Sequence, residues 1–590
     1  MGLAWVVVII IVIIATVIIL RVIMNTYYNA SIRQLYTTNK IDPVADIVII
    51  GGGTAGCVVA RRLTDKYPHK SIIVVERGQD LRHDRSVYRA ENSLNIAYTA
   101  PYSQVIVTDY PGVSSTVGAI YGGCSSHNYG LVVQGTKERY RRTWLSKLRM
   151  DEDELDKYIN KVYSKINVFF LPPSINPIKY VVPMVGITIR NGLIPVKEAL
   201  DVFINHGPLR ADKGLTQNMM DAMEYSTFPK NRKDSENSKV CGKSNIKIED
   251  NYNANGVVNC VCPTQQLYVD PIQGVRASIN RQYLPDGYTP KNLTLIAGAE
   301  VDTIDPSTLS VTTTDGRVIR SREKMVLCAG GILSPYLLLK SKVKIPGIGK
   351  GLVNHYGTQA VFAIKGIKDF SSGPLAFLPY DSSHRDICDK DDTYGNYDFE
   401  RERKWQILTS GSALTNIDFL KKQGVDTNAL QAEGYIFVTY LIYLMDPQTR
   451  GEIVVSADGS PKVNLNLFKN KEDCQSLIDG MKYLGRNYNH LRSKYDIKAI
   501  FPPENVYREN DNIILDYVKK GVGIADHYSC TMSGVVDSNL ALKGYPNFHV
   551  VDASVFPAIS DGNTEFPAIM IGEIGADKII RSMCNNESSC

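Results

Sequence analysis

The hydrophobic pattern of the chain opens with one continuous apolar run. Residues 3–20 (LAWVVVIIIVIIATVIIL) are apolar except for Thr16. A helix of this length spans about 27 Å, close to the ~30 Å hydrocarbon core of a bilayer. A cleaved signal peptide is the alternative, but it normally has a basic start and a shorter apolar core. We therefore predict an uncleaved transmembrane anchor at the N-terminus.

The orientation of this anchor is open. Arg21, Arg33 and Lys40 follow the run and favour a cytoplasmic body by the positive-inside rule. N-glycosylation tripeptides favour the opposite side, although such tripeptides are common by chance. They lie at Asn29, Asn292 and Asn586.

After a polar linker the pattern becomes that of a strand–helix–strand unit. Residues 47–50 form a short apolar run, and a glycine-rich turn follows. A helix with one apolar face comes next, and residues 71–78 (SIIVVERG) form a second apolar strand that contains Glu76. Strand, turn, helix and strand within about thirty residues predict a βαβ unit of a parallel sheet.

The rest of the chain is less regular. Strand-like runs recur at residues 292–304 and 318–331, whereas residues 151–255 show little pattern. From residue 351 to 510, strand-like runs alternate with acidic loops. The apolar run 434–445 is short for a membrane span and rich in β-branched and aromatic residues. We therefore predict that it is a buried strand.

Composition and charge narrow the class of protein. The 590 residues are 44% hydrophobic and 22% charged, as in folded globular proteins, and exceed one ordinary domain in length. The net charge of +5 comes from scattered basic residues, so no nucleic-acid partner is expected. The 11 cysteines show no metal-ligand spacing and are few for a disulfide scaffold. We expect no metal site and mostly free thiols.

The turn of the βαβ unit carries the first candidate chemistry. Gly51, Gly53 and Gly56 form a G-x-G-x-x-G motif between strand and helix, and Glu76 lies twenty residues after Gly56. Such glycines permit the turn, the approach of a pyrophosphate and close helix–strand packing. The helix N-terminus stabilises phosphate charge, and the acid can accept hydrogen bonds from ribose hydroxyls. The motif predicts a dinucleotide site without separating FAD from NAD.

Further blocks of sequence carry a family resemblance. They are GAIYGGCSSHNYGLVVQG at 118–135, LCAGGILSPYLLLKS at 327–341, and HYSCTMSG at 527–534 with VVDASVFPAISDGNTEFPAIMIGEIGAD at 550–577. With the dinucleotide motif, they follow the order found in the glucose–methanol–choline (GMC) family of FAD-dependent oxidoreductases. The chain resembles this family over residues 45–583, and its GGCSSHN stretch is similar to that of choline oxidase. Such proteins also occur in particles of large DNA viruses, and the composition permits a viral origin.

The resemblance implies an α/β fold. A Rossmann-like FAD-binding domain is interleaved with a substrate domain built on an antiparallel sheet. The expected ranges are an anchor at 1–24, a linker at 25–44, FAD-binding parts at 45–150, 255–350 and 520–583, substrate parts at 151–254 and 351–519, and a tail at 584–590.

FAD is the cofactor that the resemblance implies. Its first signature wraps the flavin in family members, Val301 looks like the position that meets adenine, and the DAS stretch resembles late flavin contacts. The implied cofactor-binding residues are Gly51, Gly53, Thr54, Ala55, Gly56, Glu76, Gly118, Gly122, Gly123, Ser125, Ser126, His127, Asn128, Val301, Asp552 and Ala553.

The family oxidises an alcohol by moving hydride from its carbon to flavin N5, and this implies a base near the substrate hydroxyl. By resemblance, His527 is that base and Asn563 is its partner, which can donate a hydrogen bond to the substrate oxygen but cannot be the base. A purely structural role for His527 is the alternative. Asp526 precedes it where the family commonly has an aromatic residue. A nearby carboxylate would raise the pKa of His527.

His127 is a candidate for covalent attachment of the cofactor. In choline oxidase, the histidine of the similar stretch is bonded to the flavin 8α-methyl. A neutral imidazole is a competent nucleophile for such a bond. The alternative is a histidine that contacts the flavin without a bond.

The leading function is therefore that of an FAD-linked alcohol oxidase or dehydrogenase, with a small alcohol as substrate and oxygen or another compound as electron acceptor. Two alternatives remain open. Hydroxynitrile lyases share the fold and bind FAD without using it as oxidant, and a structural virus-particle protein would keep the fold with idle chemistry. The N-terminal anchor would place the protein at a membrane, with the lipid bilayer as a partner.

Overall fold

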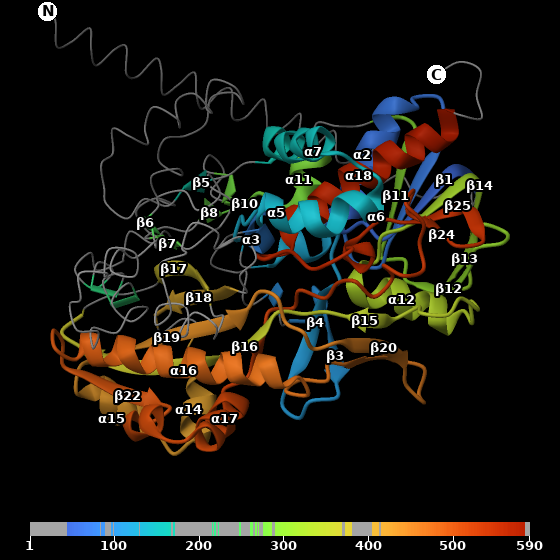
Figure 1. The fold of residues 1–590 in the computed structure, drawn as a ribbon. Helices are drawn as coiled ribbons and strands as arrows, with labels where there is room; N and C mark the ends of the chain where they lie inside the picture. The colour runs from blue at the N-terminus through green and yellow to red at the C-terminus, as the bar shows by residue number, and fades with distance from the viewer. Residues whose placement is uncertain are drawn as a thin grey trace, which may run out of the picture.

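The computed structural model describes most of the chain beyond residue 43 (Figure 1). The described residues are 44–82, 84–88, 99–128, 130–166, 275–285, 290–367, 372–379, 404–411 and 415–584, with a few short pieces between these ranges. The expected anchor, the linker up to residue 43 and the tripeptides at Asn29 and Asn586 lie outside them. Within the described residues, no helix is both long and apolar enough to cross a membrane. The anchor therefore stays a prediction.

The first sheet is mainly parallel and contains the predicted βαβ unit. β1 (Val44–Ile50) lies at its centre, parallel to β2 (Ile72–Glu76) on one side and to β14 (Val318–Leu327) on the other. Nearly every residue of β1 and β2 is buried, which explains their continuous apolar sequence. The outer strands are β11 (Leu293–Ala297), β12 (Val301–Asp305), β13 (Ser310–Thr313), β24 (Ala541–Leu542) and β25 (Tyr545–Val550).

Two helices from opposite ends of the described chain pack against each other beside this sheet (Figure 1). They are α2 (Thr54–Lys66) and α18 (Glu565–Cys584). A Cβ on Gly572 of α18 would lie 2.8 Å from the Cβ of Val58 in α2, so this crossing needs glycine. The contact brings the first turn of each helix to one place.

A buried ionic cluster ties these two helices to their neighbours. Glu573 of α18 is fully buried and accepts hydrogen bonds from Arg62 of α2 and from the Tyr283 hydroxyl, the latter at 3.0 Å. Lys161 Nζ lies 2.9 Å from the same carboxylate, and Arg62 also pairs with Asp577. Buried charges persist only when paired in this way, so the cluster fixes how the helices dock.

Helix α7 (Glu152–Lys165) packs against α18 and was not predicted. Its N-terminus is capped by Asp151, whose carboxylate accepts the backbone N–H of Glu154 at 2.8 Å. Its buried face consists of Leu155, Tyr158, Ile159 and Val162.

The second sheet is largely antiparallel and confirms that the apolar run 434–445 is a buried strand. That strand is β19 (Tyr435–Leu444), between β16 (Tyr356–Lys365) and β18 (Lys404–Ser410). Helix α16 (Lys471–Leu491) covers β16 and β19 and was not predicted (Figure 1). The sheet continues with β6 (Lys247–Ile248), β7 (Cys260–Cys262), β17 (Ser372–Pro379), β22 (Ile497–Phe501) and β23 (Gly523–Ile524).

A third sheet joins segments that the sequence reading assigned to different domains. The hairpin of β3 (Ser103–Thr108) and β4 (Ser114–Gly118) pairs through β3 with β21 (Pro461–Asn464). β20 (Gly451–Val455) and β15 (Lys350–Leu352) complete it. The remaining elements are α3 (Arg85–Tyr88), η2 (Gly123–Ser126), α5 (Lys137–Tyr140), η3 (Arg141–Leu145), α6 (Ser146–Leu148), β5 (Phe169–Phe170), β8 (Gln266–Leu267), β9 (Val269–Asp270), β10 (Val275–Arg276), α11 (Ile279–Tyr283), α12 (Gly330–Lys340), α14 (Ile417–Lys422), α15 (Thr427–Ala432), η8 (Glu504–Arg508), α17 (Asp511–Lys520) and η9 (Ala553–Val555).

The side-chain amide of Asn292, the third tripeptide asparagine, is engaged in the fold. It donates to the carbonyl oxygens of Tyr67 at 3.0 Å and Thr64 at 3.4 Å. An amide held in this way is poorly placed to accept a glycan. The free cysteines of the described chain are Cys57, Cys124, Cys328, Cys474 and Cys530, whereas Cys584 is disulfide-bonded.

Candidate active site

A cavity of about 350 Å³ lies where the carboxyl ends of β1, β2 and β14 meet the first turns of three helices. The helices are α2, α12 and α18. Helix N-termini expose backbone N–H groups and carry partial positive charge, so the cavity suits an anionic ligand. Ligands of α/β sheets bind at this edge, beyond the carboxyl ends of the strands.

Three glycines beside the cavity have no room for a side chain. Gly51 has a φ of +97°, and a Cβ there would lie 2.5 Å from the carbonyl oxygen of Cys328. A Cβ on Gly56 would lie 2.0 Å from the Gly51 carbonyl oxygen. Gly123 has a φ of +57°, and a Cβ there would lie 2.8 Å from the Cα of Gly53. The two glycine segments touch and form a cradle that fits a pyrophosphate at the N-terminus of α2.

Glu76 ends β2 in the wall of the cavity. Its carboxylate accepts the backbone N–H of Gly52 at 2.8 Å and that of Gly78 at 2.7 Å. These two bonds fix the carboxylate and leave lone pairs for ribose hydroxyls. Val301 lines the cavity as well. The residues present therefore fit a dinucleotide.

The predicted cofactor-binding residues divide into two groups. Those that line the cavity are Gly51, Gly53, Thr54, Ala55, Glu76, Gly118, Gly123, Val301, Asp552 and Ala553. Those that do not line it are Gly56, Gly122, Ser125, Ser126, His127 and Asn128. A contact with the cofactor stays a prediction for both groups.

The two serines of the GGCSSHN loop hold the loop itself. Ser125 Oγ donates to the Gly122 carbonyl oxygen at 2.7 Å and accepts the backbone N–H of Ile279 at 3.1 Å. Ser126 Oγ donates to the Tyr121 carbonyl oxygen at 3.2 Å. Both side chains are buried, so their role in this structure is to shape the loop.

A chain of polar contacts connects this loop to α18. Arg276 Nη1 donates to Asn128 Oδ1 at 2.6 Å, and Asn128 Nδ2 donates to Glu565 Oε2 at 3.2 Å. The hydroxyl of Thr54 lies 3.3 Å from both Glu565 oxygens. Burial raises the pKa of Glu565 to about 7, although Thr54, Arg276 and Asn128 each lower it.

His127 is buried, and its Nε2 atom has no hydrogen-bond partner within the described chain. This atom lies 2.9 Å from the place where a Cβ on Gly118 would be, and Gly118 lines the cavity. Burial, followed by the charge of Arg276, lowers the pKa of His127 to about 4. The imidazole is therefore neutral at physiological pH, which is its nucleophilic form.

His527 and Asn563 lie together beside the cavity. Asn563 Nδ2 is 3.3 Å from His527 Nε2, and Gln406 Nε2 donates to Asn563 Oδ1 at 2.9 Å. On the other side of the ring, His527 Nδ1 is 2.8 Å from His355 Nδ1. His355 Nε2 in turn is 3.0 Å from the carbonyl oxygen of Ser560. The chain neighbours of both His527 and Asn563 line the cavity.

The direction of these hydrogen bonds follows from the groups that make them. A carbonyl oxygen only accepts, so His355 Nε2 carries a proton and donates to Ser560. His355 Nδ1 is then an acceptor, and His527 Nδ1 carries the proton between the two rings. The lone pair of His527 remains on Nε2, where Asn563 Nδ2 donates to it. A neutral His527 therefore presents Nε2 as its basic atom.

Both histidines are held in the neutral form. Burial lowers the pKa of His355 to about 4. The pKa of His527 lies well below its usual range because of burial and, secondly, the charge that His355 can carry. A positive charge on either ring would be removed from water and would repel a charge on the other ring.

The expectation that Asp526 raises the pKa of His527 is wrong. The Asp526 carboxylate accepts the Thr116 backbone N–H at 3.3 Å, the Thr116 hydroxyl at 3.0 Å and the Tyr528 hydroxyl at 3.1 Å. Asp526 has a φ of +55°, and its contacts run to β4 and Tyr528. Burial raises the pKa of Asp526 itself to about 6.

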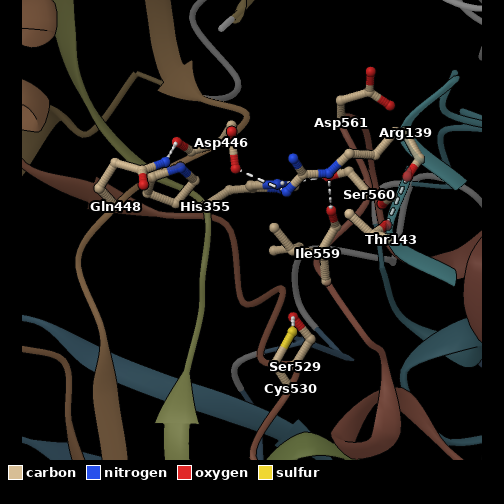
Figure 2. A network of polar contacts seen from close by, with 12 residues as sticks. Arg139, Thr143, His355, Asp446, Gln448, Ser529, Cys530, Ile559, Ser560 and Asp561 are labelled. Atoms are coloured by element: carbon tan, nitrogen blue, oxygen red, sulfur yellow. Dashed lines mark hydrogen bonds and ion pairs between the residues drawn. The ribbon is translucent and has the colours of Figure 1, made fainter. Parts of the chain in front are cut away.

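Arg139 fixes the segment that carries the Ser560 carbonyl. Figure 2 shows its guanidinium between Asp446 and the backbone of Ile559. Nη2 donates to Asp446 Oδ1 at 2.8 Å and Nε donates to the Ile559 carbonyl oxygen at 3.0 Å. Arg139 therefore fixes the Ser560 carbonyl, which is the acceptor for His355 Nε2, by holding the preceding residue Ile559.

Sequence reasoning missed His355, Gln406, Arg276 and Glu565. His355 lies 172 residues before His527, and nothing in the stretch GLVNHYG marks its histidine as part of the site. Glu565 lies inside the C-terminal block that carries the resemblance, two residues after Asn563. Its acidic side chain beside Asn563 was the available signal.

Comparison with known proteins agrees with the dinucleotide site that the geometry indicates. Two family profiles, both described as GMC oxidoreductase, match residues 45–357 (the N-terminal profile) and 447–572 (the C-terminal profile). A solved structure of pyridoxine 4-oxidase from Mesorbium loti aligns with 91% of this chain and 99% of its own, with a TM-score of 0.64 and 17% identity. That likeness shows a shared fold.

Curated relatives include oxygen-dependent choline dehydrogenases. That of Pseudomonas syringae pv. tomato is 24% identical over 52% of this chain and 60% of its own length, so the chain spans about 60% of the first relatives it matches. That of Photobacterium profundum is 24% identical over 91% of this chain and 93% of its own length. The N-terminal family profile covers more than half of the chain, and the cavity has the glycine cradle and spaced acid of an FAD site. The chain belongs to the GMC oxidoreductase family, whose members bind FAD.

Proposed function

We propose that the protein is an FAD-dependent oxidoreductase that oxidises a small alcohol to its carbonyl compound, with His527 as the base. One observation carries this proposal. The hydrogen bonds from Gln406 through Asn563, His527 and His355 to Ser560 leave a neutral His527 with its lone pair on Nε2, beside the cofactor cavity. The choline dehydrogenase relatives support a small alcohol as substrate and oxygen as acceptor.

The cofactor would be held by the groups that line the cavity. The glycine cradle and the first turn of α2 would take the pyrophosphate, and Glu76 would take ribose hydroxyls. When bound, FAD supplies the hydride acceptor, N5 of the flavin.

His527 and Asn563 would act together on the substrate hydroxyl. Asn563 Nδ2 would donate to the oxygen, and His527 Nε2 would take the hydroxyl proton. The alcohol would thus give its hydroxyl proton to His527, and with the hydride acceptor that FAD supplies it would leave as the carbonyl compound. Because an alkoxide-like oxygen pushes the hydride out, removal of the O–H proton by His527 would make cleavage of the neighbouring C–H bond easier.

Anaerobic mixing with a panel of small alcohols, choline included, tests the proposal. At least one alcohol should bleach the flavin absorbance, and admission of air should restore it if oxygen is the acceptor. His527→Ala should slow bleaching by about 10²–10⁴-fold, the usual contribution of a general base. Flavin that stays oxidised with every alcohol would sink the oxidoreductase proposal and favour a lyase or an inert scaffold.

We also propose that His127 forms a covalent bond to the flavin. Support comes from its buried, unpartnered Nε2 atom and its neutral state. A new N–C bond to the 8α-carbon would replace a C–H bond there, and the two electrons and two protons released would pass through the flavin ring to the electron acceptor. After acid precipitation, the yellow colour should stay with the protein and should be lost in His127→Ala. Complete release of flavin by the parent protein would end this proposal.

The domain ranges stay a proposal as well. We propose FAD-binding parts at 45–150, 255–350 and 520–583, because these ranges supply the strands of the first sheet. We propose substrate parts at 151–254 and 351–519, because most strands of the second sheet come from the latter. Limited proteolysis should cut first between these ranges.

A further inference from the structure

Glu565 differs from two other buried carboxyl groups in the cavity wall, those of Glu76 and Asp552. Glu76 and Asp552 each accept two backbone N–H groups at 2.7–2.9 Å. The hydrogen bonds to Glu565 come instead from the side chains of Thr54 and Asn128, and they are longer, at 3.2–3.3 Å. Longer bonds from neutral side chains solvate a carboxylate less well than backbone donors do, so Glu565 ionises at a greater cost.

Glu565 lies where the negative charge of the cofactor is expected. It is the first residue of α18, and Thr54, which contacts both its oxygens, is the first residue of α2. Glu565 is 9% exposed and lines the cavity. A pyrophosphate at the N-terminus of α2 and an ionised Glu565 would therefore compete for the positive end of the same helix.

The charged groups around Glu565 leave it able to exchange a proton. Arg276 of β10 reaches it through Asn128. The pKa of the Cys124 thiol in η2 is raised first by burial and further by the charge of Glu565. Arg62 of α2 and Lys161 of α7 lie farther along α18, where both pair with the buried Glu573 carboxylate. With burial as the largest cause, the Glu565 carboxyl gains and loses its proton near neutral pH.

We propose that Glu565 makes FAD binding take up a proton, because the cofactor binds the chain whose Glu565 carboxyl is neutral and is opposed by the ionised form. The neutral carboxyl adds no negative charge to the cavity and provides an O–H donor. Glu565 thereby sets the pH range in which the protein takes up FAD by reversible binding. This inference rests on the proposed function and adds to it a coupling between FAD binding and proton uptake.

FAD titration across pH tests the inference. Affinity is measured by quenching of flavin fluorescence in apoprotein of His127→Ala, so that a covalent bond cannot mask reversible binding. From pH 6 to pH 8.5 the Kd should rise about 30-fold, since it increases about tenfold per pH unit once the carboxyl is ionised. In His127→Ala/Glu565→Gln the Kd should stay within about threefold of its pH 6 value throughout, because glutamine cannot ionise, its oxygen can still accept from Asn128, and its amide can donate to the Thr54 hydroxyl.

A matched control separates Glu565 from the general charge of the cavity. Glu300 also lines the cavity, but its side chain is exposed. Glu300→Gln should retain the whole pH dependence. Calorimetry at pH 8 in two buffers of different ionisation enthalpy should show about one proton taken up per FAD by the His127→Ala protein and about none by Glu565→Gln.

The outcomes are distinct. FAD that binds with the same Kd at every pH, or a Glu565→Gln variant that keeps the full dependence, overturns the inference and leaves the proposed function standing. Absence of FAD binding at pH 6 in all variants overturns the proposed function instead. If circular dichroism shows that Glu565→Gln does not fold, the proton count on the His127→Ala protein decides the question.

Discussion

Single side chains at this site act through the direction in which their hydrogen bonds run. The Ser560 carbonyl cannot donate, and this one restriction orients the proton on His355 and then the proton on His527. The basic nitrogen of His527 is thus chosen by a backbone atom two contacts away. His355 is a positioning residue in this arrangement, since it acts through His527.

Substitution of His355 tests that role. His355→Phe removes the acceptor of the His527 Nδ1 proton, so His527 can turn to the tautomer whose Nε2 is protonated and no longer basic. We expect kcat/KM for an active alcohol to fall about 10–100-fold, the cost of leaving a buried donor unpaired. His355→Gln can still accept this proton and should recover part of the loss. Equal losses in both variants would argue for a merely structural histidine.

The acidic limb of the pH–rate profile reports on His527. Because the pKa of His527 is lowered and the base must be neutral, kcat/KM should hold as the pH falls through 6.5 and decline only in more acidic solution. Asp526→Asn should leave this limb unmoved, since the Asp526 carboxylate binds Thr116 and Tyr528. A limb at or above pH 6.5, or one displaced by this substitution, would contradict the geometry.

Motifs explain which residues of the site could be read from the sequence. His527 and Asn563 both lie in the C-terminal block that resembles the family, so the resemblance could assign a role to each. His355 directly precedes β16, and Gln406 lies in β18. Only the folded sheet brings these two side chains close to His527 and Asn563. The effect of Asp526 was predicted wrongly because the direction of its side chain depends on a backbone angle that the sequence does not reveal.

Helices and strands could be predicted where the hydrophobic pattern of the sequence was strong and clearly bounded. β1, α2, β2 and β19 were expected at nearly their observed positions, because continuous apolar runs and glycine turns mark them. α7 was missed although Leu155, Tyr158, Ile159 and Val162 follow helical spacing, since proline-rich and polar neighbours hid it. α16 was missed within a stretch dominated by strand-like runs.

The ionic cluster around Glu573 is expected to stabilise the docking of α2 and α7 on α18. Glu573→Gln should lower the free energy of unfolding by about 3 kcal/mol, because Arg62 and Lys161 would lose a buried partner. Urea unfolding followed by circular dichroism measures the change. Glu154→Gln is the control, since its pair with Arg581 is more exposed and should contribute less than about 1 kcal/mol. Similar losses in both variants would contradict a special role for the cluster.

The whole molecule is held together by sheets that cross the expected domain borders. The third sheet pairs the β3–β4 hairpin with β21, and β4 reaches Asp526 beside His527. Sequence could not predict this pairing, because short strands with few apolar residues give little indication of their partners. The two larger sheets are therefore expected to respond together when the cavity is filled.

Two described tryptophans test this coupling. Trp144 lies in η3 and packs on Phe556, while Trp405 lies in β18 of the second sheet. In His127→Ala apoprotein, FAD at 100 times its Kd should stabilise the fold by about 2.7 kcal/mol. Thermal unfolding of Trp144→Phe and Trp405→Phe in that background, followed by fluorescence, should shift to the same extent with FAD. A shift seen by one reporter alone would show that the sheets melt independently.

The packing of α18 on α2 has a consequence for synthesis of the protein. Thr54 and Glu565, which touch across this contact, are separated by 511 positions in the chain. A ribosome that has made the dinucleotide motif must translate almost the whole remaining message before the helix that covers it emerges. The apolar face of α2 that packs on α18 therefore stays uncovered during most of elongation, and such transiently exposed surface is prone to aggregation.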